Sequence, residues 1–197
     1  MRAVQTRAEG LYKSYGDKRV LVGFDAVFAT GSVTGIVGPS GCGKTTLLSI
    51  LMGIEHPDAG VVTGVPHAKS AVFQEDRLLE GFDAVANVRF VVGRRTPDAE
   101  IRAHLERIGL AGSLSQPVSG LSGGMRRRVA LVRAMLAPSD IVFLDEAFKG
   151  LDAGNRERAL AYVAACRRGR TIVMVTHDPE EVVALDGGLI RMTMPAT

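Results

Sequence analysis

The chain has 197 residues, of which 46% are hydrophobic and 23% are charged, and this length suits one domain with a substantial apolar core. Its formal net charge of +3 is too small to indicate nucleic-acid binding by itself, and the presence of only two cysteines excludes a disulfide-rich scaffold. The first residues lack the apolar segment of a secretory signal, and no run approaches the roughly 18 apolar residues of a membrane span. We therefore expect a soluble protein of the reducing cytosol that reaches a membrane only through a partner.

Short apolar runs bounded by turn residues alternate with helical patterns along the chain. Because these runs are continuously apolar, they are typical of strands in a parallel sheet that is covered on both faces. In chain order, the predicted elements are strand Val33–Val37, helix Lys44–Met52, strand Ser70–Phe73, helices Pro97–Ile108 and Met125–Leu136, strand Ile141–Leu144, helix Glu157–Cys166 and strand Thr171–Val175. This order predicts an α/β fold.

The segment from about Leu78 to Ser119 contains no convincing buried strand, and Ile101, Leu105 and Ile108 within it recur at helical spacing. We interpret this segment as a mostly helical insertion. The predicted organisation is therefore a single domain over residues 1–197, with a core of about 1–77 and 120–197 and a helical subdomain of about 78–119.

The stretch "GPSGCGKTT" at residues 38–46 directly follows a predicted strand and opens a predicted helix. It satisfies the pattern G-x-x-x-x-G-K-[ST], in which glycines let successive backbone N–H groups point at phosphate oxygens, helped by the positive end of the helix dipole. In this pattern Lys44 reaches the β- and γ-phosphates of a nucleotide, and the Thr45 hydroxyl binds Mg²⁺. The candidate nucleotide-binding residues of the loop are Gly38, Pro39, Ser40, Gly41, Cys42, Gly43, Lys44, Thr45 and Thr46.

Two carboxylates end the buried run of "IVFLDE" at residues 141–146. We expect Asp145 to hold Mg²⁺ through water, and Glu146 to polarise the attacking water as the general base. Kinases, GTPases, helicases and transport ATPases all share such a core, so these residues do not select among them. The N-K-x-D motif with which GTPases read their base is absent from the sequence.

The stretch "LSGGM" at residues 121–125 predicts a second anion site at the start of a helix. Ser122, Gly123 and Gly124 form a small turn rich in hydrogen-bond donors, and Gly123 lies 22 residues before Asp145. A domain with one phosphate-binding loop has no evident need for a second one. One explanation is that the second site serves the nucleotide of another subunit.

With this stretch the sequence resembles the ATP-binding cassette (ABC) ATPases over nearly its whole length, with its motifs in family order. "KSYG" places Tyr15 where the family stacks an aromatic ring on adenine. "VFQED" places Gln74 at the residue that contacts Mg²⁺ and water and senses the membrane partner. "GLD" places Asp152 at the loop that crosses to the other subunit, and "VTHD" places His177 at the γ-phosphate switch.

The resemblance implies a P-loop NTPase core with a mostly parallel sheet flanked by helices, a small N-terminal antiparallel β portion and a helical subdomain. It implies ATP and Mg²⁺ as ligands, and a head-to-tail homodimer in which each ATP lies between the phosphate loop of one copy and the signature residues of the other. The implied catalytic residues are Glu146, His177, Lys44 and Gln74. The implied metal-binding residues are Thr45, Gln74 and Asp145. The implied signature residues are Leu121, Ser122, Gly123, Gly124, Met125 and Asp152.

The resemblance also implies separate integral-membrane permease subunits, an indirect solute-binding protein, no nucleic acid, and a peripheral place on the cytoplasmic face of the cell membrane. "LSGGMR" and "VFQEDRLL" are most similar to importers of the nitrate, sulfonate and taurine group. The chain departs from that group at Ala147 and Gly150, where proline and alanine are usual, and the lost proline is expected to loosen the turn after Glu146. A subunit of an exporter and a non-transport ABC ATPase stay open as alternatives.

The basic run Arg126–Arg128 allows two interpretations, a patch that attracts nucleic acid or nucleotide, and a solvated helix face with one or two local ion pairs. We favour the solvated face. Cys42 lies inside the phosphate loop, and we interpret it as a small filler, because no His or Asp is placed by sequence to activate it as a nucleophile.

Overall fold

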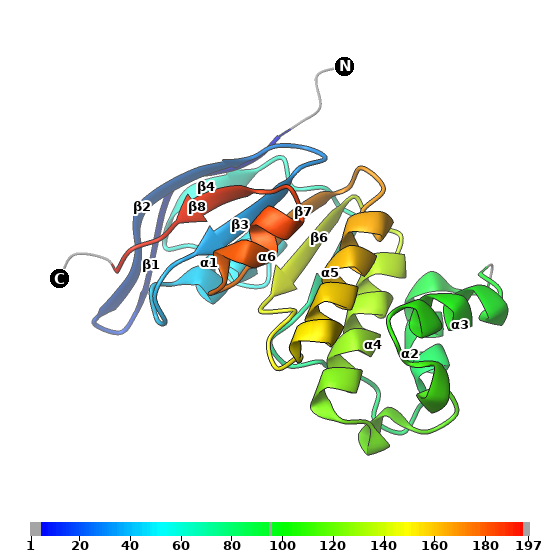
Figure 1. Cartoon of the computed structure of the whole chain (residues 1–197). Helices are drawn as coiled ribbons and strands as arrows, with labels where there is room; N and C mark the ends of the chain where they lie inside the picture. Colours follow the sequence, from blue (N-terminus) through cyan, green and yellow to red (C-terminus); the bar gives the residue numbers. More distant parts are fainter. Residues whose placement is uncertain (1–4, 95, 195–197) are drawn as a thin grey trace.

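The computed structural model describes residues 5–94 and 96–194, and a five-stranded parallel sheet forms its centre (Figure 1). In spatial order the strands are β5 (Lys69–Val72), β6 (Ile141–Asp145), β7 (Thr171–Val175), β3 (Val33–Val37) and β8 (Gly188–Arg191). Every neighbouring pair is parallel, so the carboxyl ends of all these strands lie at one edge of the sheet. Parallel neighbours need crossover connections, which the intervening helices supply.

The central sheet is buried on both faces. Ile141 and Phe143 of β6 belong to one apolar cluster with α1 (Lys44–Met52). Val142 and Leu144 belong to a second cluster that includes residues of α4 (Gly123–Leu136) and α5 (Ala153–Cys166). Because successive side chains of a strand point to opposite faces, both faces of such a strand are mostly apolar. This explains the continuous apolar runs in the sequence.

A second, antiparallel sheet packs against α1. In spatial order its strands are β2 (Lys18–Phe28), β1 (Thr6–Tyr15) and β4 (Ala59–Thr63). Leu11 and Phe28 from this sheet share one apolar cluster with Leu47 and Leu51 of α1. The small N-terminal antiparallel portion that the resemblance implies is therefore confirmed.

The segment between β5 and α4 is helical. It contains α2 (Ala84–Val92), α3 (Asp98–Arg107) and two single 3₁₀ turns, Ala111–Ser113 and Val118–Gly120. In Figure 1 it lies beside α4, on the side away from the antiparallel sheet. Val88 and Ile101 belong to the same apolar cluster as α4 and α5, and the cluster continues into the central sheet. The boundaries near 78 and 119 stay a prediction, since the apolar core runs across them.

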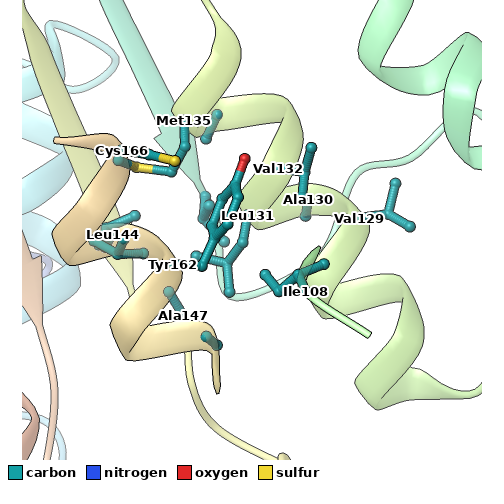
Figure 2. Close-up of a cluster of buried hydrophobic side chains, with 14 of the residues drawn as sticks. Ile108, Val129, Ala130, Leu131, Val132, Met135, Leu144, Ala147, Tyr162 and Cys166 are labelled. Atoms are coloured by element: carbon teal, nitrogen blue, oxygen red, sulfur yellow. The ribbon is translucent and has the colours of Figure 1, made fainter. Parts of the chain in front are cut away.

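The side chain of Tyr162 packs α5 against α4 and α3. Figure 2 shows its side chain among Ile108, Leu131 and Met135, which come from the α3 end and from α4. The buried Tyr162 hydroxyl lies 3.0 Å from His104 Nδ1 of α3, and burial raises the pKa of this phenol. The polar tip of the ring is thus satisfied inside an apolar layer.

Helix α6 (Pro179–Ala184) lies against β3 because residue 35 is glycine. A Cβ at Gly35 would lie 2.2 Å from Val182 Cγ2, so any larger residue would push α6 away. The start of α6 is fixed by Asp178, whose carboxylate accepts a hydrogen bond from the Glu180 N–H at 3.0 Å. Since His177 directly precedes this cap, the packing also positions a candidate site residue.

Each predicted helix and strand is present, whereas β1, β2, β4, β8, α2 and α6 were not predicted individually. Strands Val33–Val37 and Thr171–Val175 and helix Lys44–Met52 have the predicted limits. Helices α4 and α5 begin two and four residues before their predicted starts, because Ser122 and Asp152 cap them. Among residues 5–94 and 96–194, no helix has both the length and the apolar character that crossing a membrane requires.

Candidate nucleotide site

The loop between β3 and α1 depends on glycines in the left-handed conformation. Gly41 and Gly43 have φ angles of +82° and +98°, which other residues rarely adopt. A Cβ at Gly43 would also lie 2.8 Å from Val20 Cγ1 and 2.9 Å from the Val20 carbonyl oxygen. Gly43 caps α1 without a side-chain hydrogen bond, so the first N–H groups of α1 are available to an anion.

Lys44 is only 8% exposed, and its ammonium group lies against the loop. Its Nζ donates hydrogen bonds to the carbonyl oxygens of Gly38 at 2.8 Å and Pro39 at 2.9 Å. These two carbonyls offset the cost of burying the ammonium group and hold it beside the N-terminus of α1. The loop therefore presents one fixed cation and a set of backbone donors.

The loop forms one wall of a cavity of about 400 Å³, a volume typical of small-molecule sites. The predicted cis site residues that line this cavity are Tyr15, Ser40, Gly41, Gly43, Lys44, Thr45, Thr46, Gln74 and Glu146. Sequence analysis missed Lys18, Val20 and Lys149, which also line it. Lys18 begins β2 and Lys149 lies in the turn after Glu146, and no local sequence pattern marks either lysine as a site residue. The two additional lysines favour a polyphosphate.

A larger cavity of about 480 Å³ lies between α5 and α6, away from the phosphate loop. Its charged lining residues are Arg156, Glu157, Asp178, Glu180 and Glu181. Four carboxylates against one arginine repel an anionic ligand. The lining of the smaller cavity therefore suits an anionic ligand better.

Some predicted residues lie outside the cavity wall. Gly38 and Pro39 contribute carbonyl oxygens to Lys44 instead. Cys42 is fully buried beside Gly38, which fits its interpretation as a small filler. His177 is exposed at the end of β7 and does not line the cavity, so its role stays a prediction.

Asp145 lies behind the cavity wall, next to Thr45. The Thr45 hydroxyl donates to Asp145 Oδ1 at 3.4 Å, and the carboxylate is 4% exposed. Burial raises the pKa of Asp145, partly opposed by the hydrogen bond from Thr45. A hydroxyl and a carboxylate oxygen are donors that Mg²⁺ accepts. Two such donors fill only part of the coordination shell of Mg²⁺, which phosphate and water oxygens would complete. Within the described residues there is no group of three or more His, Cys, Asp or Glu side chains that could hold a metal.

Glu146 is held in an unusual conformation at the cavity edge. Its φ angle is +47°, and its backbone N–H donates to the Val175 carbonyl oxygen at 2.9 Å. Lys149 Nζ donates to Glu146 Oε2 at 2.6 Å, and the Lys149 N–H closes a turn onto the Glu146 carbonyl oxygen at 3.1 Å. Ala147, which stands where the resemblance leads us to expect proline, is buried, and the loosening of this turn stays a prediction.

The signature residues lie elsewhere on the chain. Ser122 caps α4 and accepts a hydrogen bond from the Met125 N–H at 3.3 Å. Asp152 caps α5, and hydrogen bonds from Asn155 hold its pKa below the usual range. The turns are adjacent, since a Cβ at Gly124 would lie 3.3 Å from Leu151. The remaining signature residues are Leu121, which is buried, and Gly123, which is exposed. None of these residues lines the cavity of its own chain.

The interpretation of Arg126–Arg128 as a solvated face is wrong for two of the three residues. Arg127 and Arg128 are 9% and 6% exposed. Arg128 donates at 3.0 Å to the carbonyl oxygens of both Ile108 and Gly109, where α3 ends. Only Arg126 behaves as predicted, in an ion pair with Glu80 at 3.2 Å. The sequence pattern could not reveal that unpaired carbonyls elsewhere in the chain face this helix.

Comparison with known proteins identifies relatives over most of the chain. Residues 21–149 match the sequence model of the family described as ABC transporter. The chain is 42% identical over 179 residues to the aliphatic sulfonates import ATP-binding protein SsuB 1 of Nocardia farcinica, covering 89% of this chain and 73% of that protein. It is 37% identical over 198 residues to the taurine import ATP-binding protein TauB of Yersinia pestis, covering 93% of this chain and 78% of that protein.

Solved structures share the fold. The dimeric structure of a bacterial ABC transporter cassette superposes with a TM-score of 0.82 at 24% identity, over 95% of this chain and 94% of that chain. A bacterial Atm1-family ABC exporter with ATP bound gives a TM-score of 0.84 at 22% identity, over 100% of this chain and 38% of that chain. Together with the match over residues 21–149 and relatives near 40% identity, these findings show that the chain belongs to the ABC transporter family, among its ATP-binding ATPases.

Proposed function

We propose that this chain binds and hydrolyses ATP at the phosphate-loop cavity as the nucleotide-binding subunit of an ABC importer for small sulfonates. The observation that carries this proposal is the lining of the cavity, in which the phosphate loop meets Tyr15, Gln74 and Glu146. These residues come from segments far apart in the sequence, and each has the chemistry that ATP hydrolysis needs at that place.

The roles of the residues follow from their positions. The exposed ring of Tyr15 offers adenine a stacking surface at one end of the cavity, and Lys44 with the N–H groups of α1 binds the phosphates. At the other end, the Glu146 carboxylate accepts a proton from the attacking water. Gln74 orients that water, and His177 steadies the γ-phosphate. The work of this site is positioning and charge stabilisation.

Mg²⁺ fits beside Thr45 and Asp145, with Gln74 as a further ligand. When bound, the ion neutralises charge on the β- and γ-phosphate oxygens. Thr45 and Asp145 are already within 3.4 Å of each other, so the protein needs little rearrangement to offer both oxygens.

The signature residues serve the ATP of a second copy of this chain. Ser122 and Gly123 are exposed at the start of α4 and are remote from the chain's own cavity. A head-to-tail pair related by a two-fold axis lets each copy offer these residues to the other's phosphates, and the assembly closes without further copies. The dimeric state of the similar cassette structure supports this arrangement.

A cluster of exposed apolar side chains offers a docking surface for a membrane permease. Its centre is the pair Phe82 and Phe90, and Leu79 and Val91 are further exposed apolar residues of α2 and the segment before it. The rings of Phe82 and Phe90 meet edge to face, with centroids 5.4 Å apart. Exposed apolar groups that gather in this way mark interaction surfaces. The segment also carries Gln74 at its start, so docking here would reach the cavity.

Import of sulfonates is supported by the relatives, which are import ATP-binding proteins for aliphatic sulfonates and for taurine. The fold does not decide the direction of transport, because the structure of an exporter shares it. The chain would then act on the cytoplasmic face of the cell membrane, and a separate solute-binding protein would deliver the sulfonate to the permease.

Replacing Asp145 by Asn should stabilise the nucleotide-free protein and abolish Mg²⁺-dependent hydrolysis. The pKa of Asp145 is raised by burial, so its ionised form is costly at neutral pH. The gain in stability of Asp145→Asn over the wild type should therefore be present at pH 7–8. It should vanish below the pKa of an exposed aspartate, because Asp145 is then protonated in both the folded and the unfolded chain. We expect a rise in Tm of about 2–4 °C by calorimetry. Asp140→Asn, at the exposed start of β6, is the control, and a lower Tm for Asp145→Asn at pH 8 would contradict the reasoning.

Replacing Glu146 by Gln should leave ATP binding intact and slow hydrolysis by about 10²–10⁴-fold, because the amide cannot accept the proton of water. The bound ATP should then keep two copies of the chain associated, and light scattering during size-exclusion chromatography would detect this dimer. Glu157→Gln, on the exposed surface of α5, should behave as the wild type. If the Glu146→Gln protein kept wild-type turnover, another group would be the base.

Replacing Phe90 by Ser should reduce recovery of the chain with its permease from mildly solubilised membranes, and lower taurine uptake by cells. ATP binding should be unchanged, since Phe90 does not line the cavity. Val183→Ser on α6 is the matched control, because Val183 is 69% exposed against 62% for Phe90. Recovery of the wild-type chain with DNA or ribosomes in place of a permease would contradict the proposal, as would net taurine export.

A further inference from the structure

Two arginines of α4 bind the backbone that follows β5. The Arg127 guanidinium donates from Nη1 to the Phe73 carbonyl oxygen at 2.6 Å and from Nη2 to the carbonyl oxygen of Gln74. Arg133 donates to the carbonyl oxygens of Arg77 at 2.8 Å and Asp76 at 2.9 Å. The Gln74 segment, defined as residues 73–77, is thus attached to α4 through four of its carbonyl groups. Such a segment has no strand or helix to satisfy these groups itself.

A buried charge reinforces this attachment. Asp76 Oδ1 lies 3.2 Å from Arg127 Nε, and the two side chains are 13% and 10% exposed. Burial raises the pKa of the Asp76 carboxyl, against the opposite influence of Arg127, Arg126 and Arg133. Asp76 Oδ1 accepts no aligned hydrogen bond, so this contact acts through charge alone. Removing Arg127 would therefore leave two unpaired carbonyl groups and a buried carboxylate whose remaining ion pair, with Arg126 Nε, spans 3.9 Å.

The same helix begins with the signature turn. Ser122 caps α4, and Arg127 follows it by five residues, little more than one helical turn. Gln74, in the segment that Arg127 binds, lines the phosphate-loop cavity. Because an α-helix is rigid over this length, a displacement of the Gln74 segment must move the signature turn with it.

We propose that Arg127 is a positioning residue that locks the Gln74 segment to α4, so that the γ-phosphate end of one cavity and the signature turn offered to the other copy move as one unit. This inference rests on the proposed function, since the second copy is what makes the coupling matter. Filling one cavity then orients the signature turn toward the second cavity, which gives positive cooperativity between the two ATP molecules.

The test compares Arg127→Gln with the wild type in three measurements. ATP affinity of the nucleotide-free monomer should change less than about twofold, because Arg127 does not line the cavity. Turnover should fall by about 3–30-fold, and its Hill coefficient for ATP should fall toward one. Hydrogen exchange should become faster both in residues 73–77 and in the signature turn of the nucleotide-free protein. Arg127→Lys should restore turnover and cooperativity only partly, because one ammonium group cannot reproduce the planar, paired donors of a guanidinium group.

Arg170→Gln is the control, because Arg170 also donates to backbone carbonyl oxygens, those of Met135 and Cys166 at 2.8 Å, but does so at the end of α4 that is away from the signature turn. It should lower Tm without changing the Hill coefficient. If Arg127→Gln alone folds poorly, Arg127→Gln with Asp76→Asn removes the buried carboxylate, which would keep only its 3.9 Å ion pair with Arg126, and should show the same loss of cooperativity. The inference would be overturned if hydrogen exchange in residues 73–77 became faster in Arg127→Gln while its turnover and Hill coefficient stayed at the wild-type values. A wild-type chain without ATP-dependent dimerisation or hydrolysis would instead contradict the proposed function.

Discussion

Parallel pairing of β6 and β7 with β3 decides where the candidate site lies. The register aligns Asp145 with Val175, and Val175 with Ile36, so the phosphate loop and the carboxylate pair leave the sheet at one edge. Two backbone hydrogen bonds extend this register, from Glu146 N–H to the Val175 carbonyl oxygen and from Thr176 N–H to the Ile36 carbonyl oxygen. Gln74 reaches the same edge because β5 pairs with β6. Ligands of open α/β sheets bind at this edge for the same reason.

This edge also concentrates charge where a protein core normally excludes it. Lys44 and Asp145 are both almost fully buried, and each depends on one or two polar partners. Burial of an ionisable group is costly unless a ligand or partner compensates it. The charges of ATP and Mg²⁺ would compensate both groups under the proposed function. The ion pair of Glu146 with Lys149 keeps the remaining carboxylate oriented at the cavity edge.

Much of the central sheet could be predicted from local sequence. Largely apolar runs predicted the limits of Val33–Val37 and Thr171–Val175, because strands buried on both faces leave few polar positions. The antiparallel strands β1 and β2 were expected only from the family resemblance. Register shifts near Leu11 and Lys13 interrupt their alternation, so no simple pattern marks them.

The missed residues share a physical cause. Lys149 matters because a turn folds it back onto Glu146, and Arg127 matters because it faces carbonyl oxygens some fifty positions earlier in the chain. A lysine or arginine in a sequence carries no sign of which acceptor it will meet. The caps Ser122 and Asp152 are different, since their residue types could have given the true starts of α4 and α5.

The central claim is that one chain holds half of each ATP site. Lys44→Ala removes the phosphate-loop cation, and Ser122→Arg blocks the signature turn, so each variant alone should be inactive. Mixing the two should restore up to about one quarter of wild-type turnover, because half of random dimers are mixed and each mixed dimer contains one complete site. If each site lay within a single chain, the mixture would stay as inactive as its components, and the shared-site claim would be contradicted.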